Sequence, residues 1–176
     1  MKPPISEHSA SVSVLDLIFK QVDYFWPGVW DDLSNMMNSI PGKHPTPEVA
    51  KFNFILATTS LNLRKAFDLF PREQAERIFI QTLKLYEMQF REPRQFHAIT
   101  GIIRKYMDAY NLGLTSLSNP IDQVSLLLYA SLGLKSPQGG NGADAGIASF
   151  LTETLMNFSG KWEAMNEKYE VVETVV

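Results

Sequence analysis

The segment RQFHAITGIIRKYMDAY, residues 94–110, carries a histidine inside a clear helical pattern. An imidazole at such a position can ligate a metal or transfer a proton. At about 100° per residue, however, His97 lies almost opposite the apolar row that contains Ile99, Ile103 and Tyr106. The pattern therefore predicts that His97 faces away from the core.

One feature of this helix keeps a functional role open for the face that carries His97. Gly101 follows one turn later on the same face, and glycine inside a helix costs about 1 kcal/mol relative to alanine. A glycine there lets a ligand, a partner helix or another segment of the chain approach closely. We therefore expect His97, Gly101 and Arg104, together with Arg94, to form a polar contact patch for a partner.

The sequence does not support a metal or a bound cofactor. The chain has no cysteine, which excludes thiolate nucleophiles, disulfides and cysteine-ligated zinc or iron–sulfur clusters. No acid is followed three residues later by histidine, as a di-iron site in a helical bundle requires. His8 and His44 lie in a predicted N-terminal tail and a proline-rich loop, so neither is placed as a second haem ligand. We expect no metal and no cofactor.

Phosphate-binding and hydrolase motifs lack their structural context. GNGADA, residues 140–145, matches the dinucleotide pattern GxGxxA, but a predicted helix and Ser136-Pro137 precede it where the motif needs a strand. The chain contains no GxSxG sequence. Acidic pairs such as Asp31-Asp32 leave catalysis open, but such pairs are common on solvated helices. No residue is identified as catalytic, which favours a non-enzymatic protein.

The stretch YFWPGVW, residues 24–30, places aromatic side chains around a helix break at Pro27-Gly28. Trp26 and Trp30 are one turn apart, and a break widens the gap to a neighbouring helix. The two rings are therefore candidate contacts for a small apolar ligand or cofactor. The competing interpretation is that they fill the space beside the kink as part of the core.

Every segment with a clear hydrophobic period predicts a helix, and none alternates as a strand does. Capping signals delimit these segments, for example Thr46-Pro47-Glu48 and Asn119-Pro120. The prediction is an all-α, single-domain bundle of about six helices with a long C-terminal helix. Residues 1–11 are expected to be a flexible N-terminus, 12–172 the bundle and 173–176 a flexible C-terminus. Residues 13–40 fit either one kinked helix or two.

The predicted C-terminal helix carries an apolar seam that steps by three and four residues from Ile147 to Val172. A seam of this length requires a long partner helix, so Trp162, Met165 and Tyr169 are candidate contacts for a partner. Residues 64–105 have an excess of four positive charges and residues 144–176 an excess of four negative charges. These opposite charges favour contact within one molecule or between two copies.

Bulk properties restrict the remaining possibilities. A sequence pI of about 5.6 argues against nucleic-acid binding. The chain shows no apolar leader and no run long enough for a membrane span, so a cytoplasmic protein is expected. The sequence thus favours a helical interaction or oligomerisation module that binds itself, as a homodimer, or another protein. The alternative is a domain that binds a small apolar ligand near residues 24–30.

Overall fold

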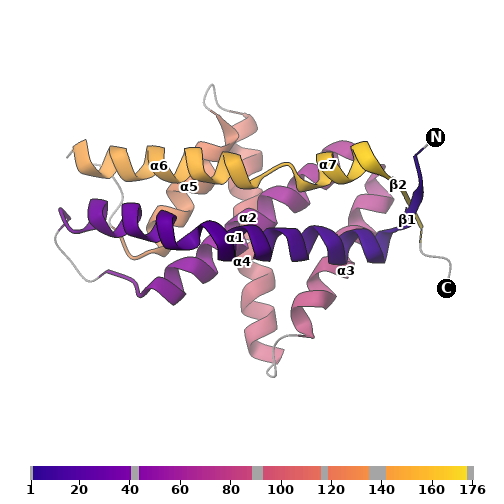
Figure 1. The fold of residues 1–176 in the computed structure, drawn as a ribbon, viewed down its shortest axis with the longest axis horizontal. Coiled ribbons are helices and arrows are strands. Elements are labelled where there is room, and N and C mark those ends of the chain that lie inside the picture. Colours follow the sequence, from indigo (N-terminus) through magenta and orange to yellow (C-terminus); the bar gives the residue numbers. More distant parts are fainter. Residues whose placement is uncertain (1, 41–43, 89–92, 116–118, 135–141, 174–176) are drawn as a thin grey trace.

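The computed structural model describes residues 2–40, 44–88, 93–115, 119–134 and 142–173. The structure confirms the predicted all-α fold and also contains one small parallel sheet of two short strands (Figure 1). No helix within them is long and apolar enough to cross a membrane. The elements are β1 (Pro4–Ser6), α1 (Glu7–Met37), α2 (Pro47–Leu69), α3 (Arg72–Glu87), α4 (Pro93–Leu114), α5 (Pro120–Ser131), α6 (Gly142–Phe158), α7 (Lys161–Lys168) and β2 (Glu170–Val172).

The N-terminal segment forms one helix, α1, which continues through the Pro27-Gly28 pair. Both residues of this pair are exposed, so water can satisfy the backbone carbonyl that loses its hydrogen bond to Pro27. The helix starts at Glu7, capped by the side chain of Ser6, which accepts a hydrogen bond from the backbone N–H of Ser9. Helical structure therefore begins before residue 12, the predicted start of the bundle.

Helix α2 is the centre of the bundle. Every residue from Phe54 to Leu63 is buried, and α2 contacts each of the other six helices. Its start follows the predicted signals, since Thr46 caps it and Pro47 is its first residue. Polar side chains on a helix that is buried on all sides usually need partners inside the protein. The Thr59 hydroxyl pairs with the Tyr86 hydroxyl at 2.8 Å, and Ser60 donates to the Leu56 carbonyl at 2.6 Å.

The predicted long C-terminal helix is interrupted, and this part of the prediction is corrected. Helix α6 ends at Phe158, Gly160 adopts a left-handed conformation with φ of 90°, and α7 starts at Lys161. The buried amide of Asn62 on α2 bridges the interruption. It donates to the Phe158 carbonyl at 3.1 Å and accepts from the Lys161 N–H at 2.7 Å. Asn62 thus replaces backbone hydrogen bonds that a continuous helix would make.

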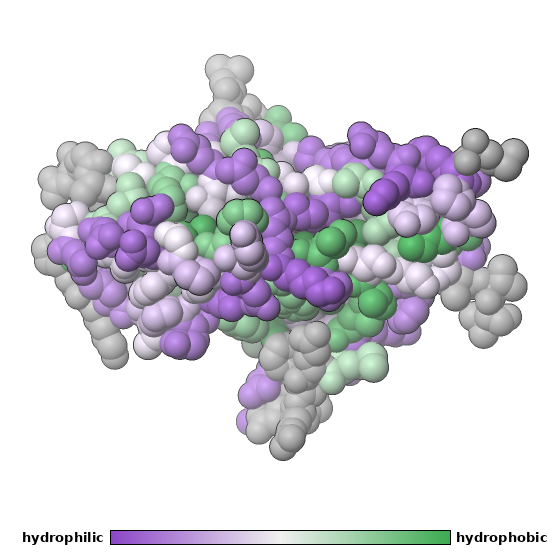
Figure 2. Space-filling view, in the orientation of Figure 1, coloured by the Kyte–Doolittle hydropathy of each residue, from purple (hydrophilic) through white to green (hydrophobic). Residues whose placement is uncertain are grey.

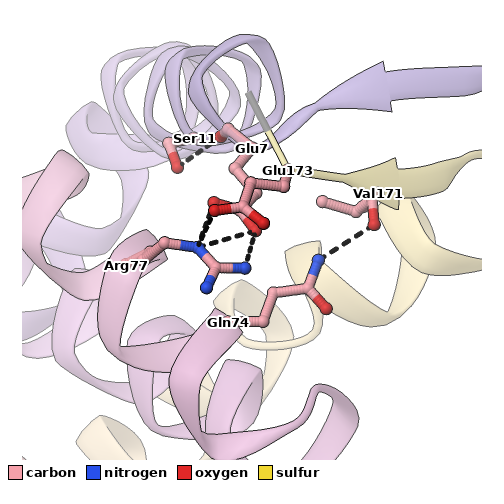
Figure 3. A network of polar contacts seen from close by, with 6 residues as sticks. All are labelled: Glu7, Ser11, Gln74, Arg77, Val171 and Glu173. Atoms are coloured by element: carbon pink, nitrogen blue, oxygen red, sulfur yellow. Dashed lines mark hydrogen bonds and ion pairs between the residues drawn. The ribbon is translucent and has the colours of Figure 1, made fainter. Parts of the chain in front are cut away.

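Residues near both ends of the described chain form hydrogen bonds with α3 (Figure 3). Glu7 is 1% exposed, and its carboxylate accepts hydrogen bonds from Nε and Nη2 of Arg77 at 3.0 and 2.8 Å. The Gln74 side chain donates to the Val171 carbonyl at 2.9 Å, and β2 pairs with β1 in parallel register. Residues 2–11, predicted to be flexible, therefore belong to this structure. Of the predicted C-terminal tail, only Glu173 lies within the described residues.

Gly113 gives a direct test of the packing between α4 and α5. A Cβ atom at this position would lie 2.6 Å from the Cα of Pro120 and 3.0 Å from its carbonyl oxygen. We therefore expect Gly113→Ala to lower the free energy of unfolding by about 1–3 kcal/mol. Gly101→Ala is the matched control, because open space surrounds that position and the change should stabilise α4 by about 0.5–1 kcal/mol. Equal effects in urea unfolding would contradict this account.

Asn62→Ala tests the bridge across the interruption between α6 and α7. The substitution removes the partners of the Phe158 carbonyl and the Lys161 N–H in a buried environment. We expect a loss of about 2–4 kcal/mol in urea unfolding, because each unsatisfied buried group costs about 1–3 kcal/mol. Asn53→Ala is the control, since the one hydrogen bond described for the Asn53 amide is to the Val49 carbonyl one turn earlier in its own helix. A similar small loss for both variants would exclude the bridging role.

Candidate functional site

Helix α4 has the two faces that its sequence predicts. Ile99, Ile103 and Tyr106 are all at most 4% exposed and lie in the core. His97 is exposed, and the only ring contact described for it is with the neighbouring Phe96, at 5.9 Å between centroids. The predicted outward orientation of His97 is confirmed, which places the imidazole where a core-bound cofactor cannot reach it.

The other three residues of the predicted contact patch are also exposed. Arg94, Gly101 and Arg104 all face solvent, and no atom lies within 4 Å of the place where a Cβ of Gly101 would stand. No other segment of the described chain therefore uses the close approach that this glycine permits. The surface over Gly101 is available to another molecule.

A hollow of about 450 Å³ opens beside this face, and we call it the α2–α4 hollow. It lies between the end of α2, the first half of α3 and the second half of α4. Its volume falls in the range of sites that hold a ligand or an anchoring side chain. The lining consists of apolar Phe67, Phe79, Ile80 and Met107 and of polar Glu76, Arg104, Asp108 and Asn111.

Arg104 joins the predicted patch to this hollow. Its guanidinium lies 5.6 Å from the ring centroid of Phe79, within the range of a cation–π contact between α4 and α3. The Phe79 ring in turn contacts Phe67 edge to face at 6.5 Å. Arg104 has no salt bridge among the described residues. Its charge lies over an apolar floor, and neither of the carboxylates that line the same hollow, Glu76 and Asp108, forms a salt bridge with it among the described residues.

The outer residues of α4 form one continuous strip. His97, Gly101, Arg104, Asp108 and Asn111 follow one another at alternating steps of four and three, which is the spacing of a single helix face. The last three line the hollow, and the first two extend beyond it toward the start of α4. The predicted patch and the hollow therefore adjoin on this helix face. We call the face formed by His97, Gly101, Arg104, Asp108 and Asn111 the α4 strip.

The sequence reasoning missed the apolar side chains on α3 and α2. Ile80 is 51% exposed although it is an isoleucine on an amphipathic helix. It lies off the buried row of α3, which includes Ile78, Leu83 and Tyr86. The signal available in the sequence was the isoleucine at position 80, which lies off the apolar row of this helix. Phe67 gave no such signal, because its spacing on α2 matches that of a core residue.

The predicted ligand contacts Trp26 and Trp30 belong to the packed interior. Trp26 is 7% exposed and stacks on Trp30 at 6.2 Å between ring centroids. It also contacts Phe54 on α2 at 5.7 Å. A second hollow of about 420 Å³ lies beside Pro27-Gly28, where the sequence predicted a helix break. Its lining includes Phe25 and Gly28 and does not include either tryptophan. Trp26 is thus a core residue beside α2, and Trp30 is half-buried against the core.

The predicted partner contacts of the C-terminal seam also pack within the chain. Trp162 is 1% and Met165 7% exposed, and Trp162 meets Phe70 edge to face at 5.6 Å between ring centroids. Tyr169 is half-buried against the same core. Helices α1, α2 and α5 together supply the apolar surface that the seam requires. In this conformation a partner molecule does not reach Trp162.

The described residues contain no group of three or more acidic or histidine side chains arranged to hold a metal ion. Burial raises the pKa of Tyr106 to about 12, partly offset by its hydrogen bond to Ser131. The pKa of Tyr86 is raised further for the same reason, and its hydroxyl pairs with Thr59. Both phenols are enclosed in the core. They support the fold and have no open space in which to meet a substrate.

Comparison of the chain with protein-family models, with curated proteins and with solved structures gave no match.

The buried phenol of Tyr106 predicts a loss of stability at alkaline pH. Its pKa in the folded chain, about 12, lies above the ordinary value of 10, so the folded state favours the neutral form. This stabilisation is complete below pH 10 and falls by up to about 3 kcal/mol as the pH rises to 12. Urea unfolding between pH 9 and 12 measures the loss.

Tyr106→Phe should reduce the slope of stability against pH in this interval by about one proton. The control is Tyr24→Phe, because Tyr24 is 79% exposed and is not a core residue. This substitution should leave the slope unchanged. A slope that is the same in both variants would show that Tyr106 is not the group responsible.

Proposed function

We propose that this chain is a non-enzymatic interaction module that binds an amphipathic helix of a partner protein on the α4 strip and in the α2–α4 hollow. The observation that carries the proposal is the exposed apolar floor of the hollow next to the unpaired guanidinium of Arg104. Apolar surface rimmed by polar groups is typical of protein interaction sites. A helix with apolar anchors at steps of three and four matches such a groove.

Helices α4 and α3 form two sides of the α2–α4 hollow, and their charges favour a partner helix with one acidic and one basic flank. On α4, the exposed cations Arg94, Arg104 and Lys105 outnumber Asp108. On α3, the exposed acids outnumber the cations, with Glu73, Glu76 and Glu87 against Arg72 and Lys84. Only the Arg72–Glu76 pair forms a salt bridge among these groups. Acidic side chains of the partner would face α4 and basic ones α3, which fixes its orientation.

The test uses a fluorescent synthetic peptide of about five helical turns. It carries leucine and phenylalanine on one face, glutamate on one flank and lysine on the other, and a scrambled peptide of equal composition is the comparison. We expect saturable binding of the amphipathic peptide by the full chain, measured by anisotropy, with a Kd on the order of 10 µM. The scrambled peptide should not bind.

Three variants locate the binding surface. Ile80→Asp places a charge on the apolar floor, Gly101→Leu covers the open position on α4, and Arg104→Glu reverses the cation on the rim. Each should weaken peptide binding about tenfold or more. Val49→Asp is the control, because Val49 is 50% exposed and lies on α2 outside the hollow.

No saturable peptide binding, or binding that survives all three changes, would overturn the proposal. The alternative function is a site for a small apolar ligand. Saturable binding of dodecanoate that is lost in Ile80→Asp, together with no binding of the peptide, would favour this alternative.

A further inference from the structure

The outer face of α1 carries a protruding aromatic ring next to a cavity. Tyr24 is 79% exposed, the second highest value among the large hydrophobic residues described. One turn later, a hollow of about 420 Å³ opens between α1 and α6 at Gly28, and we call it the Gly28 hollow. It is lined by Gln21, Phe25, Gly28 and Val29 of α1 and by Thr154, Asn157 and Phe158 of α6.

Gly28 has no side chain, so it leaves space in the Gly28 hollow that another residue would occupy. No atom lies within 4 Å of the place where a Cβ of Gly28 would stand. The hollow also has apolar walls, since Phe158 is in the core and Phe25 contacts it edge to face at 6.1 Å between ring centroids. An aromatic ring from outside would find space and an apolar environment there.

We infer that the outer face of α1 binds a second copy of this chain through an antiparallel pairing of two α1 helices. If the twofold axis passes beside residue 26, Tyr24 of each copy lies opposite Gly28 of the other. The protruding ring of each molecule then enters the Gly28 hollow of its partner. The contact is closed and uses the same residues twice, as a twofold interface requires.

The charges along α1 agree with this register. The same axis places Lys20 of each copy at the level of Asp32 of the other. Lys20 is exposed, and its one salt bridge among the described residues is with Asp16 of its own helix, at 2.7 Å. Asp32 is exposed and has no salt bridge among the described residues. Two such cross-pairs would favour the antiparallel arrangement over a parallel one, in which Lys20 meets Lys20.

The surface around α1 is suited to reversible association. Figure 2 shows the face that α1 presents together with α6 and α7, where apolar patches are interrupted by hydrophilic ones. Interfaces of molecules that also exist apart are no more apolar than the rest of a protein surface. The pairing uses residues outside the α2–α4 hollow, so it stands or falls independently of the proposed partner helix.

Sedimentation equilibrium of the full chain between about 1 and 200 µM is the test, and we expect a monomer–dimer equilibrium in this range. Gly28→Leu places a side chain at the hollow, where an added Cβ meets no atom within 4 Å, and Tyr24→Asp removes the ring. Each should weaken the dimer by about tenfold or more. Val49→Asp is again the control and should dimerise like the natural chain, with circular dichroism confirming that every variant folds.

A charge exchange tests the register itself. Lys20→Glu and Asp32→Lys each place like charges opposite one another and should weaken the dimer by about threefold to tenfold. The double variant restores opposite charges and should recover affinity to within about twofold of the natural chain. A chain that stays monomeric at the highest concentration, or a dimer unaffected by the α1 changes, overturns the inference.

Discussion

The burial of α2 on all sides is the constraint on which the rest of the fold depends. Ten consecutive residues from Phe54 to Leu63 are removed from solvent, so the other helices must surround this one helix. Most polar side chains in that stretch have a partner inside the protein, as burial requires, although none is found for the Thr58 hydroxyl among the described residues. Asn62 finds its partners on the C-terminal segment, and the position of α7 follows from this requirement.

Helices α6 and α7 lie nearly in line beside α1, so the C-terminal segment runs back toward the start of the chain (Figure 1). Helix α7 packs on α2 and α1, and β2 pairs with β1 beside the buried Glu7 carboxylate (Figures 1 and 3). Arg77 compensates that carboxylate from α3, since an unpaired charge in this position would be strongly unfavourable. The two chain ends and α3 thus stabilise one another.

Two of the hollows on the described part of the chain lie beside an exposed glycine. Gly101 on α4 and Gly28 on α1 have free space above them, whereas Gly113 is required by the close contact of α4 with α5. The first surface lies beside an apolar hollow with Arg104 at its rim, and the second beside a hollow with Tyr24 next to it. We propose that both take part in association with other protein molecules.

The sequence by itself determined the helical class, most helix boundaries and the orientation of His97, because these depend on local periodicity and capping residues. It also identified the exposed patch of Arg94, Gly101 and Arg104. Only the tertiary structure decided that Trp26, Trp162 and Met165 are core residues, since an apolar stripe looks the same whether its partner helix comes from the same chain or another. The break at Gly160 was likewise beyond the sequence, because the amide that bridges it lies on α2, about a hundred residues earlier.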